Sequence, residues 1–139
     1  MSRLLHRSLI ALLICCAGTL TLTGQTTAAR DTSSPQKSLL GHWVARSAAF
    51  GDTHYYFSTG KLTMVDTSAE KGMTYTVQQS NDKERWVRIR VLMPSGLGHD
   101  KNLAFSADAS TLVSTIKDFE QTEYKHPTQW TYVDARQAP

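Results

Sequence analysis

Histidine is the first residue type to consider for chemistry in this 139-residue chain, because imidazole ligates metals and exchanges protons near neutral pH. Four histidines lie beyond the N-terminal segment: His42, His54, His99 and His126. None of them shows the H-x-H or H-E-x-x-H spacing that brings two imidazoles to one metal ion. His54 with Asp52, or His99 with Asp100, would supply ligands only if the fold brought them together. We therefore interpret these residues as surface or loop histidines and expect no metal site.

A glycine-rich segment over residues 94–100 places Ser95, His99 and Asp100 close together in the sequence. Catalytic triads are assembled from distant segments rather than from neighbours, and no G-x-S-x-G motif is present. The segment therefore predicts a flexible loop at one end of the fold. A group of carboxylates, Asp118, Glu120 and Glu123, is likewise interpreted as a solvated loop. We expect no catalytic residue, no cofactor and no enzymatic activity.

Aromatic side chains are numerous for a domain of this size, and they are the remaining candidates for a site. Most of them must fill a hydrophobic core, but some can line an apolar pocket. The candidates for contact with a small apolar or amphipathic ligand are Trp43, Tyr56, Tyr75, Phe105 and Trp130.

A second candidate surface comes from the alternation of residues 86–93. Val87, Ile89, Val91 and Met93 share one face of a strand, which leaves Trp86, Arg88 and Arg90 on the other. An exposed tryptophan beside two guanidinium groups can hold an anionic or aromatic protein partner. The alternative is that Trp86 covers a sheet edge while the arginines pair with carboxylates on neighbouring strands.

The N-terminal segment predicts where the protein works. Arg3 and Arg7 precede an apolar stretch over residues 8–22, and small residues follow up to Ala29. This is the pattern of a secretory signal peptide cleaved after Ala29. The apolar stretch is about 15 residues long, shorter than the ~20 needed to span a bilayer, so an uncleaved anchor is the weaker alternative. Lipidation at Cys16 is another. We expect a periplasmic or extracellular protein.

Cleavage changes the composition of the chain. Removing Arg3 and Arg7 leaves 13 basic and 12 acidic residues, a net charge of +1. A net charge this small does not favour binding to nucleic acid or to an anionic membrane surface. We also expect no stable membrane insertion. Both cysteines, Cys15 and Cys16, lie in the signal. The mature domain must therefore fold without disulfides, on its core alone.

Turn residues divide the rest of the chain into short strands, which is typical of an all-β protein. Residues 30–37 read as a flexible leader in which Ser34 and Pro35 cap one helical turn, and residues 38–134 as one domain with a disordered tail over 135–139. The predicted strands are 43–47, 54–58, 61–66, 73–80, 85–93, 103–106, 111–117, 124–126 and 129–133. Hairpins join them in order, so we expect an antiparallel up-and-down meander of about eight strands that curls into a barrel or half-barrel.

Several segments are similar to those of the lipocalin-like families. Residues 40–43 (L-G-H-W) resemble the opening L-G-x-W motif, which ends a helical turn and begins the first barrel strand. Residues 55–62, 105–112 and 130–133 resemble later strands of the small bacterial lipocalin-like domains. The resemblance covers most of residues 39–133 and implies a small lipocalin-like barrel.

The chain departs from true lipocalins in two ways: it has no T-D-Y-like central motif, and it differs at the position of one arginine. Those proteins place an arginine near the end of the last strand, over the tryptophan of the opening motif, whereas Arg136 lies beyond the last predicted strand. Lipocalin-like proteins include transporters, enzymes and inhibitors, so the fold does not fix the function. Two hypotheses remain: a binding module that holds a small apolar or amphipathic ligand, or an interaction protein, such as an enzyme inhibitor, that uses an outer face or loop.

Overall fold

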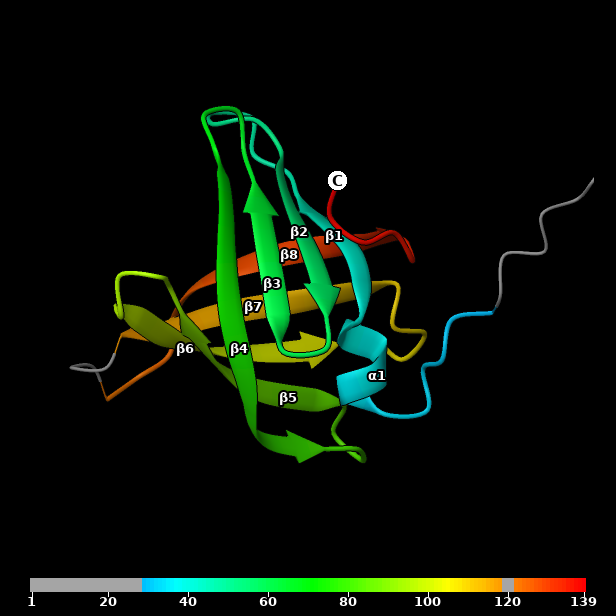
Figure 1. Ribbon diagram of the computed structural model, residues 1–139. Coiled ribbons are helices and arrows are strands. Elements are labelled where there is room, and N and C mark those ends of the chain that lie inside the picture. Colours follow the sequence, from blue (N-terminus) through cyan, green and yellow to red (C-terminus); the bar gives the residue numbers. More distant parts are fainter. Residues whose placement is uncertain (1–28, 119–121) are drawn as a thin grey trace, which may run out of the picture.

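The computed structural model describes residues 29–118 and 122–139, and shows a closed barrel of eight antiparallel strands in sequence order (Figure 1). The predicted signal peptide, with both cysteines, lies outside the described residues. The elements are α1 (Pro35–Leu39), β1 (Gly41–Ala45), β2 (Thr53–Ser58), β3 (Lys61–Val65), β4 (Glu70–Asn81), β5 (Trp86–Leu92), β6 (Gly98–Phe105), β7 (Thr111–Asp118) and β8 (Lys125–Asp134). Pairing of β1 with β8 closes the barrel, which confirms the predicted meander and decides between a barrel and a half-barrel.

The alternation predicted for β5 is present in the structure. Val87, Ile89 and Val91 are fully buried inside the barrel, where they join a core built from every strand. The tight turn between β2 and β3 also follows the prediction, since Gly60 adopts a positive φ of 73°.

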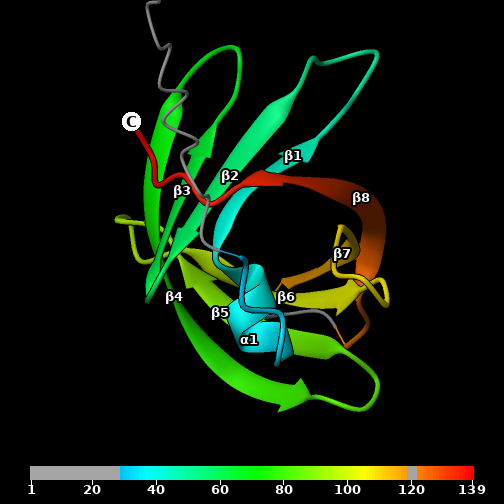
Figure 2. The ribbon, with the colours of Figure 1, turned by 90° about the vertical axis from the view of Figure 1, so that its right-hand side faces the viewer.

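Helix α1 is the helical turn expected from Ser34 and Pro35. The side chain of Ser34 accepts a hydrogen bond from the backbone N–H of Lys37, and Pro35 occupies the start of the helix. The helix lies across one end of the barrel, where Leu39 is fully buried (Figure 2). We refer to this end as the closed end. Within the described residues, no helix combines the length and the apolar character needed to span a bilayer.

The strands alternate in direction, so the loops over residues 46–52, 66–69 and 93–97 follow the strand ends that point away from α1, with the first two near each other and the third apart from them (Figure 1). We call this end of the barrel the mouth. The loops carry exposed apolar side chains, with Phe50 84% and Leu97 67% exposed.

Several predicted boundaries are wrong: β1 begins and ends two residues earlier than predicted, β4 begins three residues earlier, and two further differences concern β6 and β8. The segment expected to be a loop as far as Asp100 is already paired from Gly98, where β6 begins. A Cβ on Gly98 would collide with the carbonyl oxygen of Val91, so glycine here permits close strand pairing instead of preventing it. The last two predicted strands are one strand, β8, with an irregular register against β7 and a positive φ of 57° at His126, next to Pro127.

Candidate functional site

Four of the five aromatic residues predicted to contact a ligand lie in the core of the barrel: Trp43, Tyr75, Phe105 and Trp130. Tyr56 does not. It pairs with His42 across the sheet and stacks on that ring, with the ring centres 4.3 Å apart, on the outer face. Because successive residues of a strand point to opposite faces, the interior tyrosine of β2 is Tyr55. The placement of Tyr56 in the interior is therefore corrected to Tyr55.

The interior aromatics pack directly on one another. Tyr55 stacks on Trp130 with ring centres 4.0 Å apart, while Trp43 meets Phe105 edge-on at 5.8 Å. The indole N–H of Trp43 donates to the carbonyl oxygen of Leu39, which ties the core to α1. The half of the interior next to α1 is thus a packed core.

Lys101 is a charged residue within this largely apolar interior. It lies on the same face of β6 as Leu103 and Phe105, and its side chain is only 5% exposed. The ammonium lies 5.4 Å from the centre of the Trp130 ring. In the part of the chain that the structure describes, no carboxylate lies within ion-pair distance of it. Burial lowers the pKa of Lys101 to about 8.

Two further polar atoms in the interior have no hydrogen-bond partner among the described residues: Ser114 Oγ and Trp130 Nε1. Both residues are 1% exposed. Ser114 faces Leu103 across the β6–β7 ladder, which makes it the diagonal neighbour of Lys101. Buried polar groups in proteins nearly always have partners. We call Lys101, Ser114 and Trp130 the interior polar cluster.

Beyond this cluster, toward the mouth, the interior side chains are less deeply buried. Ile116 lies directly across from Lys101 and is half-buried, as are Met64 and Met73. Met73 packs against the core and also lines a groove of about 410 Å³ beside Met93 and Pro94. This groove lies where β4 runs past the end of β5, because the β4–β5 ladder begins only at Thr74 and Leu92. Flexible methionines therefore lie between the outer surface and the interior.

The closed end is held by Arg30, which the sequence placed in the leader. Its guanidinium lies 3.6 Å from the centre of the Tyr132 ring and 4.8 Å from that of Trp43. It donates hydrogen bonds to the carbonyl oxygens of Ala109, at 2.7 Å, and of Ser38. An arginine does cover the tryptophan of the opening motif, but it comes from the N-terminal side of the domain rather than from the C-terminal strand.

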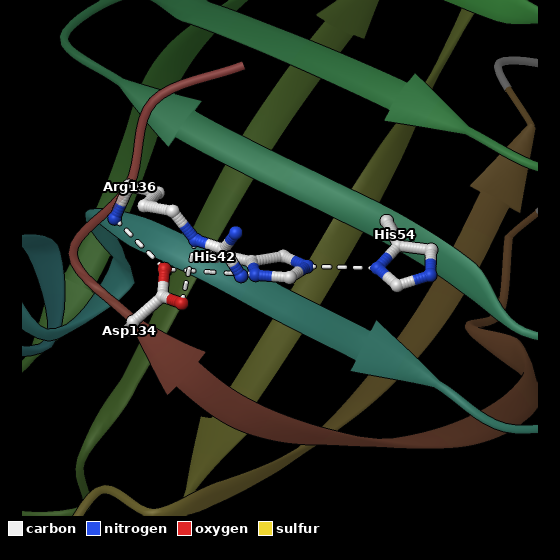
Figure 3. A network of polar contacts seen from close by, with 4 residues as sticks. All are labelled: His42, His54, Asp134 and Arg136. Carbon is white, nitrogen blue, oxygen red and sulfur yellow. Dashed lines mark hydrogen bonds and ion pairs between the residues drawn. The ribbon is translucent and has the colours of Figure 1, made fainter. Parts of the chain in front are cut away.

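A second polar network lies on the outer face of β1 and β2 (Figure 3). His42 Nε2 is 2.8 Å from His54 Nδ1, and His42 Nδ1 is 3.6 Å from a carboxylate oxygen of Asp134. Asp134 also accepts a hydrogen bond from Arg136 Nε at 2.7 Å. Although His42 is on the outer face, it is only 3% exposed, and burial lowers its pKa.

This network explains how the C-terminal segment is attached to the barrel. The short contact between the two imidazoles requires that one ring nitrogen donates and the other accepts. The pairing of β1 with β2 brings His42 and His54 together, which the search for short histidine motifs missed. No group of three or more possible metal ligands is found among the described residues. The contacts of the network attach Asp134 and Arg136 to the outer face of β1.

The predicted outer patch is present, but its side chains have partners within the protein. Arg88 lies over the Trp86 ring at 4.8 Å, and the indole N–H of Trp86 donates to Glu84. Arg90 makes two hydrogen bonds to Asp100, at 3.0 and 3.3 Å. The pairing of Arg90 with Asp100 on the neighbouring strand is the alternative stated above, in which the arginines pair with carboxylates across strands.

The fold and its interior define a class of protein: a small closed β-barrel whose apolar interior contains a polar cluster. Comparison of the chain with protein-family models, with curated proteins and with solved structures found no match. The lipocalin-like relationship is therefore still a prediction from the motifs, and the function must be argued from the site.

Proposed function

We propose that the protein, once exported, is a non-catalytic binding module of lipocalin-like type that holds a small amphipathic ligand in its barrel. The observation that carries the proposal is the ammonium of Lys101, which is buried in an apolar interior without a carboxylate partner among the described residues. A buried unpaired charge destabilises a fold, so it is expected where a ligand uses it.

The mouth supports this proposal. Half-buried Met64, Met73 and Ile116 can repack around an apolar chain, and exposed Phe50 and Leu97 extend the apolar surface outward. The alternative, a protein partner on the face of Trp86 and Arg88, has less support because those side chains are already engaged with Glu84, Gln79 and Asn102.

Binding of the neutral fluorophore 1-N-phenylnaphthylamine tests the proposal. We expect its fluorescence to rise with the wild-type protein. Ile116→Trp, which fills the interior, should weaken binding at least about tenfold. Val113→Trp is the matched control, because Val113 lies on the exposed outer face of the same strand. Absence of binding, or equal weakening by both variants, would contradict a ligand site in the barrel.

Native mass spectrometry of protein purified from its own host then identifies a ligand directly. We expect a bound small molecule in wild-type protein and its loss in Ile116→Trp.

A further inference from the structure

The interior polar cluster restricts the chemistry of its ligand. The Lys101 ammonium has three N–H donors and no acceptor, and the Trp130 indole has one donor and no acceptor. Ser114 adds a hydroxyl that can donate. These groups lie on three consecutive strands of the barrel, β6, β7 and β8. The cluster thus consists almost wholly of donors around one positive charge.

We infer that the cluster binds the carboxylate of a ligand with a single apolar chain, such as a fatty acid. This inference rests on the proposed function and names its ligand class. A carboxylate is an acceptor with two oxygens and one negative charge, so it matches a cluster that is rich in donors and holds one cation. An alcohol or an amide would bring a donor of its own and no charge, and an amine would bring a second cation.

The position of the cluster sets the direction of the ligand. Lys101 is three residues from the start of β6 at the mouth, which corresponds to a distance of about 10 Å along the strand. Toward the closed end, the next interior residues on β6 are Leu103 and Phe105, which belong to the packed core. Toward the mouth the described interior residues are only partly buried: Met64, Met73, His99 and Ile116. The carboxylate therefore lies deepest, and the apolar chain runs outward to the mouth.

The charge of Lys101 and the neutral groups around it also favour a carboxylate ligand. Burial alone lowers the pKa of Lys101, because no neighbouring anion among the described residues opposes it. Among the other titratable groups that face the interior, Tyr55 and Tyr75 have their pKa values raised by burial, so they are neutral at physiological pH, and His99 lies two residues from Lys101 on the same face of β6. A carboxylate ligand would supply a negative charge beside Lys101, which no described neighbour provides.

The test compares decanoate with decan-1-ol, which share an alkyl chain of the same length. Each is titrated against wild-type protein that holds 1-N-phenylnaphthylamine. We expect decanoate to displace the fluorophore at about ten- to a hundredfold lower concentration, the effect of a charge-assisted hydrogen bond. Lys101→Met should abolish this preference while still binding both compounds. Lys83→Met, at the exposed turn between β4 and β5, removes the same charge and should leave the preference unchanged.

The outcomes separate the two proposals. Equal displacement by both compounds, or an unchanged preference in Lys101→Met, would overturn the carboxylate inference while ligand binding in the barrel stands. If neither compound displaces the fluorophore and the fluorophore itself does not bind, the proposed function fails as well. Ser114→Ala provides a second variant in the cluster, and we expect it to reduce the preference for decanoate severalfold.

Discussion

Replacing Lys101 with methionine should make the empty protein more stable. Methionine is apolar and similar in length, so Lys101→Met removes the buried charge and leaves the space filled. The pKa of Lys101 falls from 10.5 to about 8 on folding. Because a tenfold change in an acid dissociation constant corresponds to about 1.4 kcal/mol, the charged form costs the folded state about 3 kcal/mol. At pH 7 we expect Lys101→Met to raise the free energy of unfolding by up to this amount.

The pH dependence of this stability difference tests whether the buried charge of Lys101 causes it. Between pH 8 and 10.5 the unfolded chain holds a proton on Lys101 that the folded protein has released, so wild-type stability rises with pH in this window. The destabilisation of the folded protein by the charged Lys101 is complete below pH 8 and decreases as the pH rises. The difference between variant and wild type should therefore shrink by about 2 kcal/mol from pH 7 to pH 9.5. Tyrosine ionisation affects both proteins equally and cancels in the difference.

Urea denaturation of both proteins, from pH 6 to 9.5 and without ligand, measures this difference. Lys101→Arg is the control that keeps a charge at the same position, so it should not gain stability. A difference that does not change with pH, or a Lys101→Met protein less stable than wild type at pH 7, would refute the claim that Lys101 is an unpaired buried cation. If Lys101→Met is more stable than wild type and has lost the preference for decanoate, Lys101 lowers the stability of the empty protein and contributes to ligand binding.

The remaining predictions concern the closed end, the backbone of β6 and the outer face. In protein lacking residues 1–29, Arg30→Ala should lower the free energy of unfolding by about 1–2 kcal/mol, because it removes two hydrogen bonds and the contact with Tyr132; an unchanged urea midpoint would contradict this. Gly98→Ala should cost at least about 2 kcal/mol through collision with a backbone oxygen, whereas Gly72→Ala, with open space around it, should change stability by less than about 1 kcal/mol; equal thermal midpoints for the two variants would be inconsistent with this packing. Burial lowers the pKa of His42 from 6.5, so the unfolded chain takes up a proton before the folded protein does as the pH falls. The free energy of unfolding should therefore decrease from pH 7 to pH 5, and it should decrease less in His42→Gln. The same decrease in both proteins would exclude His42 as the cause.

Most of the fold could be predicted from local patterns. Alternation over 87–91, the glycine turn at Gly60 and the capped turn at Ser34 each specify their structure through nearby residues, and the structure has all three. Closure of the barrel depends on pairing between β1 and β8, which are far apart in the sequence, so the choice between barrel and half-barrel needed the structure.

The candidate site was largely missed because it depends on distant residues. Gly96 and Gly98 predict a loop, so the sequence pattern leaves Lys101 outside the strand that holds Leu103 and Phe105, whereas β6 includes all three. With β6 extended to Gly98, the alternation Lys101, Leu103, Phe105 would have shown a lysine on an apolar face. The meeting of Lys101 with Trp130 depends on the closed barrel, which no short motif encodes.

The titration of Lys101 tests the central claim most directly. Carbon-detected NMR of the lysine Cε groups, assigned with Lys101→Arg, gives its pKa with and without saturating decanoate. We expect a pKa of about 8 in the free protein. Saturating decanoate should raise this pKa by about 1–2, which corresponds to ten- to a hundredfold tighter binding of the carboxylate to the charged amine. A Lys101 that titrates near 10.5 in the free protein, or whose pKa does not move under saturating decanoate, would contradict the account.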